Sequence, residues 1–188
     1  MKTYTGKTVD DAVSKACLDL GVTIDQLNYE VTLETKGLFS KKAEIACWTV
    51  EMVQEYIENL IRKILTDMQF EVETVSYVQD GRIYCNINTS NNSILIGKAG
   101  VILRAINLII KNAVSTTFKK RLEVSVDING YKEERYKTVL RTKADLKLDP
   151  MPADERKVMH QEIAKMDHLK TESKGEGKNR YMTISYVD

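Results

Sequence analysis

The chain has 188 residues, of which 43% are hydrophobic and 29% charged, a composition typical of globular domains and unlike that of disordered or fibrous chains. Its longest uninterrupted apolar run, residues 45–48, is far shorter than the roughly 20 residues of a membrane span. The first seven residues have no apolar segment, so we expect no signal peptide. The three cysteines are odd in number and widely spaced. They argue against a disulfide framework or a zinc site and favour a cytoplasmic location.

Positive charge is concentrated in one segment of a chain whose net charge is only +1. Residues 83–122 contain no Asp or Glu and carry six basic residues: Lys98, Arg104, Lys111, Lys119, Lys120 and Arg121. A segment of this kind favours a polyanionic partner at that place. The alternative interpretation is a chance asymmetry on a solvated face.

The first 48 residues are predicted to fold in the order strand, helix, strand, strand. Apolar residues from position 9 to 20 recur at helical spacing, with Thr8 as the expected N-cap and Gly21 as the end. Alternation predicts strands over residues 27–33 and 43–47. The turn between them contains Leu38 and Phe39 among lysines, so we expect this unit to dock a protein or a second copy of the chain.

Residues 50–128 are predicted to follow the order α-β-β-α-α-β. An amphipathic helix over about 50–68 precedes two strands, which are joined at Asp80-Gly81 by a hairpin turn. A glycine-containing segment then leads into a helix with a buried apolar face, and a third strand covers about 122–128. We expect the single tryptophan, Trp48, to lie exposed or at an interface just before this segment.

The C-terminal segment is predicted to contain a helix over residues 131–143 and a second one from Pro152 to about Asp167. A polar turn and a closing strand over residues 181–187 follow. The fold class is therefore α+β with three small αβ units. We place the domains at residues 1–48, 49–130 and 131–188.

The clearest local motif is a Gly-x-x-Gly turn between two helical patterns, at Ile96-Gly97-Lys98-Ala99-Gly100. Glycine at both ends removes side chains from the backbone, so that a sugar–phosphate chain can approach the amides and the start of the next helix. Lys98 adds a cation at the tip, and apolar helices on each side would supply a floor for unstacked bases. Taken alone, this motif also fits an ordinary helix–turn–helix.

In this position the segment resembles a type II KH domain, whose Ile-Gly-basic-x-Gly signature falls on residues 96–100 and whose element order covers about 50–128. KH domains clamp about four nucleotides of single-stranded RNA or DNA with this loop. The resemblance implies that Ile96, Gly97, Lys98, Ala99 and Gly100 form the clamp, and that Arg104 assists from the next helical turn.

A second motif, Arg156-Lys157-Val158-Met159-His160, places an Arg and a His one turn apart on a helix. With the segments 149–152 and 171–180 around it, the motif resembles the RxxxH domain, a small domain associated with single-stranded nucleic acid. The resemblance implies that Arg156 pairs with a phosphate, that His160 stacks or donates, and that Arg180 adds charge. The alternative is a solvated helix face.

The whole order resembles the bacterial Jag family, also called KhpB, in which a Jag N-terminal domain precedes the KH and RxxxH domains. The residues that carry the resemblance include the segments 7–13, 20–21, 36–39 and 127–135. It implies a non-catalytic protein that binds single-stranded RNA, or ssDNA, and acts after transcription in cell elongation or division. The implied protein partners are a small KH-domain protein, a second copy of the chain and, peripherally, a membrane insertase.

Enzyme functions are disfavoured by the sequence. Residues around Gly97-Lys98 do not form a P-loop, because Asn92 and Ala99 replace required residues. His160 and His168 lack neighbouring ligands, and nothing indicates a metal or another cofactor. Two alternatives stay open: a protein–protein scaffold or insertase-associated adaptor whose KH and RxxxH folds do not bind RNA, and, less favoured, a nuclease.

Overall fold

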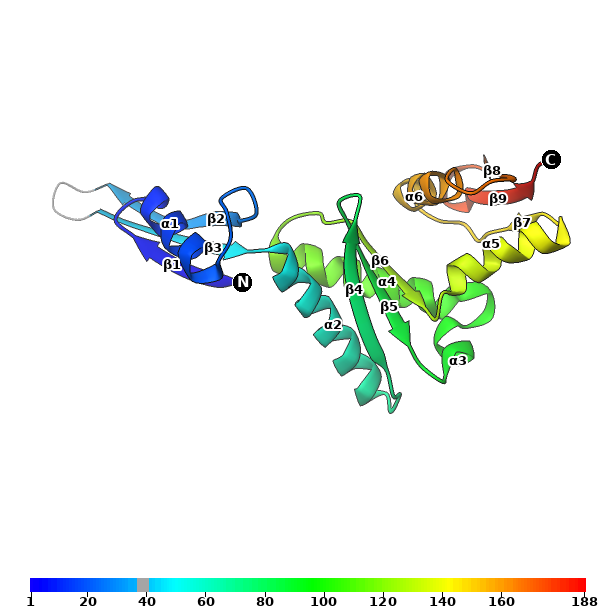
Figure 1. The fold of residues 1–188 in the computed structure, drawn as a ribbon, viewed down its shortest axis with the longest axis horizontal. Coiled ribbons are helices and arrows are strands. Elements are labelled where there is room, and N and C mark those ends of the chain that lie inside the picture. Colours follow the sequence, from blue (N-terminus) through cyan, green and yellow to red (C-terminus); the bar gives the residue numbers. More distant parts are fainter. Residues whose placement is uncertain (37–40) are drawn as a thin grey trace. The chain divides into compact units, whose positions relative to one another are not determined.

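A computed structural model describes residues 1–36 and 41–188, which divide into two compact units: residues 1–85 with 106–126, and residues 86–105 with 127–188. Within the described residues lie three three-stranded sheets and the helices that accompany them (Figure 1). The predicted α+β class with three small αβ units is confirmed. Each sheet lies inside one of the three predicted domains, whose boundaries stay a prediction.

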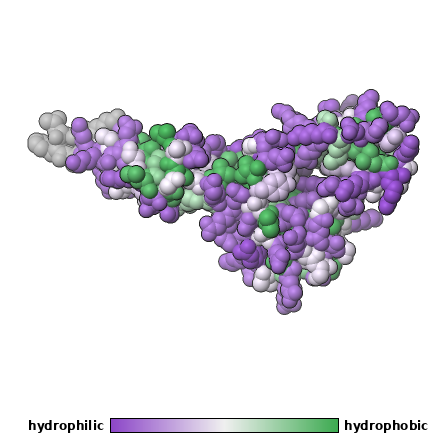
Figure 2. Space-filling model, viewed as in Figure 1, coloured by the Kyte–Doolittle hydropathy of each residue, from purple (hydrophilic) through white to green (hydrophobic). Residues whose placement is uncertain are grey.

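The N-terminal αβ unit has the predicted order. Its elements are β1 (Lys2–Gly6), α1 (Val9–Leu20), β2 (Asn28–Lys36) and β3 (Lys41–Trp48). The antiparallel sheet has the order β1-β3-β2. Ala12, Val13 and Ala16 of α1 pack against Ile45 and Cys47 of β3, because helical and strand periodicities direct these side chains into one core. Figure 2 shows hydrophobic residues gathered over this unit. Leu38 and Phe39 lie outside the described residues.

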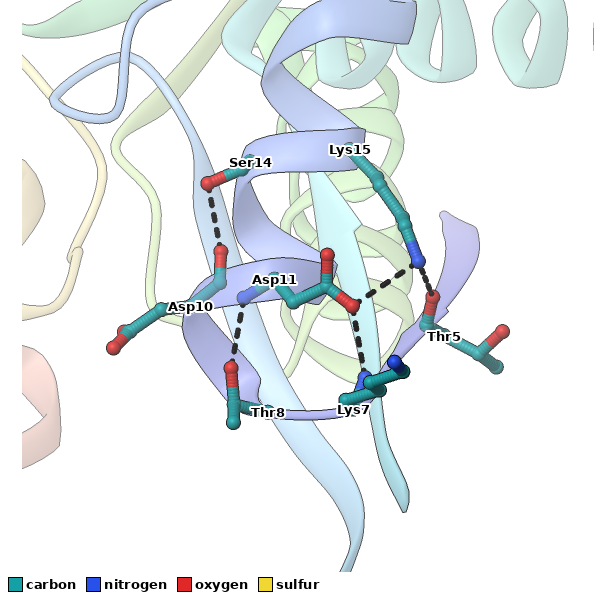
Figure 3. A network of polar contacts seen from close by, with 7 residues as sticks. All are labelled: Thr5, Lys7, Thr8, Asp10, Asp11, Ser14 and Lys15. Atoms are coloured by element: carbon teal, nitrogen blue, oxygen red, sulfur yellow. Dashed lines mark hydrogen bonds and ion pairs between the residues drawn. The ribbon is translucent and has the colours of Figure 1, made fainter. Parts of the chain in front are cut away.

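Local side-chain chemistry sets both ends of α1. The Thr8 hydroxyl accepts a hydrogen bond from the Asp11 N–H at 3.1 Å, as an N-cap does (Figure 3). The Asp11 carboxylate accepts from the Lys7 N–H at 2.8 Å and pairs with Lys15 at 3.1 Å (Figure 3). Gly21 ends the helix at a φ of 66°, a left-handed conformation that glycine adopts without strain. The predicted cap and end of this helix are confirmed.

The predicted α-β-β-α-α-β order is also confirmed. The elements are α2 (Val50–Asp67), β4 (Glu73–Gln79), β5 (Arg82–Asn88), α3 (Asn92–Ile96), the single turn η1 (Lys98–Gly100), α4 (Val101–Phe118) and β6 (Val124–Ile128). Asp80 and Gly81, both with positive φ, form the hairpin between β4 and β5. The Ile83 N–H donates to the Glu123 carbonyl, and the Asn129 N–H donates to the Ile87 carbonyl. β5 and β6 therefore run parallel, and the chain between them carries the Gly-x-x-Gly turn.

Trp48 is predicted from the sequence to lie exposed or at an interface, and the first alternative is wrong, because only 4% of its surface is accessible. Its ring packs edge-on against Phe118 at the end of α4, with 5.4 Å between the ring centroids. Burial of two aromatic rings against each other is favourable both through the area removed from water and through the edge-to-face geometry. Cys47 and Cys85 are buried, and Cys17 is half-buried.

The C-terminal elements are α5 (Tyr131–Thr142), β7 (Leu146–Lys147), α6 (Ala153–Ile163), β8 (Leu169–Lys174), the single turn η2 (Gly177–Asn179) and β9 (Tyr181–Tyr186). The sheet has the order β7-β9-β8, and its core residues Met182 and Ile184 pack with residues of both helices. Two differences from the prediction are clear. The helix that starts after Pro152 ends at Ile163 rather than near Asp167, and the strands β7 and β8 were not predicted from the sequence.

Candidate nucleic-acid interface

The Gly-x-x-Gly turn closes tightly between α3 and α4. The Gly100 N–H donates to the Gly97 carbonyl at 3.1 Å, and the two glycines have φ values of 81° and 71°. A Cβ on Gly97 would lie 2.7 Å from the Ile102 side chain, and one on Gly100 would lie 3.2 Å from the Tyr131 ring. Glycine is therefore required at both positions by backbone conformation and by space.

The two residues between the glycines form an exposed tip. Lys98 and Ala99 are exposed, whereas Leu95 just before the turn is buried and anchors it. Beside the tip, apolar side chains are unusually accessible: Ile94 of α3 is 56% exposed and Val101 of α4 is 51% exposed. The Lys98 ammonium is suited to binding a phosphate, and the apolar side chains beside it are suited to contacting an unstacked base. Ile96 lies half-buried in the same segment.

Arg104, predicted to assist the loop, already has protein partners. Its Nη1 donates to the Ala99 carbonyl at 2.9 Å and lies 2.8 Å from the Asp149 carboxylate. The first contact attaches the guanidinium to the loop, as a supporting role requires. The second places an acidic group at a position where a phosphate would compete with it.

Part of the positive charge in residues 83–122 is engaged by the N-terminal αβ unit. Lys119 pairs with Glu30 at 2.9 Å, and Lys120 donates to the Asn28 side chain at 2.9 Å. Lys120 also lies 5.6 Å from the centroid of the Trp48 ring. The six basic residues therefore do not act as one uniform patch.

Arg156 and His160, the two RxxxH residues, lie on α6. Arg156 contacts the segment just before this helix, and His160 contacts the strand β8. Arg156 Nη1 donates to the Met151 carbonyl at 2.5 Å. The two ring nitrogens of His160 lie 2.5 Å from the Thr171 hydroxyl and 3.2 Å from the Ser173 hydroxyl, both on β8. Both side chains are half-buried, so they hold the domain together as well as bordering its surface.

Arg180 comes close to this motif through the backbone. The Met151 N–H donates to the Arg180 carbonyl at 3.1 Å, and the Met151 carbonyl is the acceptor of Arg156. Met151 therefore links the backbone of Arg180, whose side chain is exposed, to the side chain of Arg156. The structure brings the three predicted residues of this domain into one neighbourhood.

Sequence reasoning missed two residues at the site, Tyr131 and Asp149. Tyr131 closes the space beside Gly100, and Asp149 pairs with Arg104. Both lie in segments that follow the strand after the loop, so no local spacing connects them to it. The only signal available is the position of Asp149 before Pro150, which is too common to indicate a contact.

α4 is apolar beyond what its buried face needs. Within the helical segment Lys98–Phe118, the most apolar stretch of 18 residues has a mean hydropathy of 1.3. By length and composition alone, this is the one helix of the described residues that could cross a membrane. Uninterrupted apolar runs in this segment stay short, because Arg104, Asn107 and Lys111 break them. Leu108 and Ile109 are 56% and 52% exposed, which leaves an apolar outer face on this helix.

These features define a protein built of three small αβ units, the second of which carries the Gly-x-x-Gly turn and the third the Arg156–His160 helix. Comparison with family models agrees at both ends of the chain. Residues 4–46 match the model of the Jag N-terminus. Residues 133–186 match that of the R-3-H domain, which is the RxxxH domain of the sequence analysis.

Curated relatives match nearly the whole chain. The proteins named "RNA-binding protein KhpB" from Clostridium symbiosum and from Bacillus subtilis (strain 168) are each 29% identical to it. The alignments cover 98% of this chain and 91% and 97% of those proteins. The protein of the same name from Streptococcus pneumoniae is 28% identical over 72% of this chain and 44% of its own length. These matches confirm the resemblance to the Jag/KhpB family, and the names, which are those of binding proteins, agree with the non-catalytic interpretation.

Proposed function

We propose that this protein binds single-stranded RNA with the Gly97–Gly100 loop as the main clamp. The observation that carries the proposal is the exposed Lys98-Ala99 tip, held between two glycines that no other residue can replace without strain. RNA binding by this chain is supported by the name of its near-full-length relatives and by its RxxxH domain.

A single strand fits the loop better than a duplex. Ile94 and Val101 offer apolar contact beside the tip, and apolar contact with base faces is available only where bases are unstacked. Backbone amides at the start of α4 and the Lys98 ammonium would take the phosphates. ssDNA presents the same groups apart from the 2′-OH, so it is the closest competitor.

The RxxxH helix adds a second contact in the proposal. The Nη1 of Arg156 donates to the Met151 carbonyl, and the fork geometry of the guanidinium allows its other N–H groups to bind a phosphate. His160 is oriented by Thr171 and Ser173, so it positions the helix and borders the ligand. Arg180 supplies an exposed cation from the beginning of β9.

The domain boundaries at residues 48/49 and 130/131 are part of the proposal. On the resemblance we also propose a small KH-domain protein or a second copy of the chain as protein partner, docked by residues 1–48 as the sequence predicts. The exposed Leu108 and Ile109 of α4 offer further apolar surface for such a partner. A role in cell elongation or division, a peripheral link to a membrane insertase and a cytoplasmic location rest on the same resemblance. The free cysteines agree with a reducing compartment.

The test starts from purified full-length protein. We expect nucleic-acid ultraviolet absorbance that nuclease removes, and afterwards saturable binding of a labelled single-stranded RNA. Retention of a protein partner without any affinity for RNA would favour the scaffold alternative. Hydrolysis of the labelled RNA would favour the nuclease alternative.

A further inference from the structure

The sheet β7-β9-β8 has two chemically different faces. On one face, Met182 and Ile184 of β9 are fully buried and pack with residues of α5 and α6. Side chains alternate between faces along a strand, so Tyr181, Thr183 and Ser185 belong to the other face. The core that α5 and α6 form with this sheet therefore involves one face, and the chemistry of the second face depends on its own side chains.

Strand register assigns the neighbours on that second face. Lys147 of β7 lies opposite Thr183, and Lys174 and Lys170 of β8 lie opposite Tyr181 and Ser185. Residues directly opposite each other on neighbouring antiparallel strands point to the same face. Lys147, Lys170 and Lys174 are all exposed, so this face is open to solvent at its lysines.

The face combines cations with an aromatic ring. The Lys147 ammonium lies 4.3 Å from the centroid of the Tyr181 ring. Lys174 pairs with Glu172 at 3.1 Å, and Glu172 is the acidic residue that the register adds to this face. Asp145, just before β7, also acts on the Lys174 ammonium, so three lysines face two acidic residues and the face keeps a net positive charge. Thr183 at its centre is buried, and half-buried Ser185 lies opposite Lys170.

This face is separate from the RxxxH motif. His160 contacts Thr171 and Ser173, and these residues alternate along β8 with Lys170, Glu172 and Lys174. His160 therefore lies against the helix-covered face, and the lysines point to the opposite one. A ligand on the lysines does not occupy the place of a ligand on Arg156 and His160.

We propose that Lys147, Lys170, Lys174 and Tyr181 form a further contact surface for single-stranded nucleic acid, on the face of the C-terminal sheet opposite the RxxxH helix. An aromatic ring among cations on an open sheet is suited to stacking a base while ammonium groups take the neighbouring phosphates. An acidic peptide would use the lysines but would gain nothing from the ring. The inference rests on the proposed RNA-binding function and extends the footprint beyond the two motifs.

The experiment uses the full chain and a labelled single-stranded oligouridylate. The variant Lys147→Gln/Lys170→Gln removes two exposed cations, and the control Lys7→Gln/Lys63→Gln removes two exposed lysines from the other compact unit. We expect the first variant to bind about fivefold more weakly and its salt dependence to become shallower by about 1.4 in slope, at about 0.7 per phosphate. The control is expected to keep the slope and affinity of the unchanged protein.

A second pair of variants tests the ring itself. Tyr181→Leu should weaken binding by at least about fivefold, whereas Tyr181→Phe, which keeps the ring, should bind like the unchanged protein. Circular dichroism and the thermal midpoint confirm that each variant is folded. Because Tyr181→Leu is a half-buried change, ultraviolet crosslinking of the unchanged protein is measured in parallel, with a nucleotide adduct expected on Tyr181.

The outcomes separate this inference from the proposed function. If the unchanged protein does not bind the oligouridylate or another single strand, the proposed function fails. If it binds, and the loop variant Lys98→Asp/Ala99→Asp loses affinity while the lysine and tyrosine variants do not, this inference alone is overturned. Binding of polyglutamate in place of RNA, with equal losses in Tyr181→Phe and Tyr181→Leu, would also overturn it.

Discussion

Arg104 and Asp149, which lie 45 positions apart in the sequence, form an ion pair of 2.8 Å beside the Gly-x-x-Gly loop. Asp149 is held in place because its neighbour Leu148 is buried and donates its N–H to the Met182 carbonyl of β9. The guanidinium also donates to the Ala99 carbonyl at the tip of the loop. A carboxylate next to the C-terminal sheet would thus compete with a nucleic acid bound at the loop for the Arg104 guanidinium.

Asp149→Asn should therefore strengthen RNA binding. The two side chains are about one third exposed, so the pair is partly screened and its loss releases only modest energy. We expect affinity to rise about threefold, or about 0.7 kcal/mol, measured by fluorescence anisotropy at low salt. Asp167→Asn is the control, because it removes the same charge from an exposed position. A loss of affinity in Asp149→Asn would show that the pair orients the loop for binding.

Lys98→Asp/Ala99→Asp should abolish most binding at the loop. Two carboxylates would stand where phosphates must lie, and we expect affinity to fall about tenfold or more, or about 1.4 kcal/mol. Stability should change by only about 0.5 kcal/mol, because both positions are exposed and Asp tolerates the left-handed conformation that Ala99 adopts. The matched control is Lys98→Asn/Ala99→Asn, which has the same shape without the negative charge. Equal affinity in the aspartate variant and the unchanged protein would remove the clamp assignment.

Features that depend on neighbouring residues could be predicted from the sequence. Thr8 and Gly21 set the ends of α1 through a hydroxyl cap and a left-handed backbone, both of which act within a few residues. The Gly97–Gly100 turn could be predicted for the same reason, because the spacing of its glycines indicates where the backbone takes positive φ. The order of elements followed from these signals and from apolar periodicity.

Features that depend on distant residues could not be predicted. β8 has a polar sequence whose inward residues, Thr171 and Ser173, bond to His160, and the strand is held by its register with β9 rather than by apolar alternation. At the site, nothing near Arg104 in the sequence points to Asp149. Burial of Trp48 likewise depends on Phe118, seventy positions away.

Binding should depend strongly on salt and prefer single strands. Lys119 and Lys120 are engaged by the N-terminal αβ unit, so only part of the positive charge in residues 83–122 is available to a ligand. With three or four phosphate contacts in all, log affinity against log salt should slope by roughly −2 to −3, at about −0.7 per phosphate. The measurement is a salt titration with a single strand and with a duplex of the same sequence. A flat plot, or tighter binding of the duplex, would contradict the proposed mode.

Gly97→Ala should be more destabilising than an ordinary glycine replacement. Gly97 has a φ of 71° and a ψ of 176°, a region used almost only by glycine, and an added Cβ would lie 2.7 Å from Ile102. We expect the free energy of unfolding to fall by about 2 kcal/mol or more, measured by denaturant unfolding. Gly81→Ala is the control: its φ is also positive, but a Cβ there meets nothing within 4 Å, so about 1 kcal/mol is expected. If both variants lose the same free energy of unfolding, the Ile102 side chain moves away from the added Cβ without cost.

Asp127 should make stability depend on acid pH in an unusual direction. This carboxylate precedes α5, accepts from the Lys132 N–H at 3.4 Å and is half-buried at the end of β6. Burial raises the pKa of Asp127 despite the opposing Lys132 ammonium and backbone N–H groups. The folded state therefore binds this proton more tightly than the unfolded state, and this group's contribution to stability falls as pH rises through the folded-state pKa.

Asp127→Asn removes that titration. At neutral pH the variant should be more stable by about 1 kcal/mol, because a buried charge is replaced by a neutral amide that still accepts from Lys132. The gain should disappear below the unfolded-state pKa of about 4, where the aspartate is protonated in both states. Denaturant unfolding of the two proteins at a series of pH values measures the difference directly, with Asp25→Asn as an exposed control. A difference that stays constant from acid to neutral pH, or that has the opposite sign, would show that hydrogen bonding to the Asp127 carboxylate outweighs the cost of burying its charge.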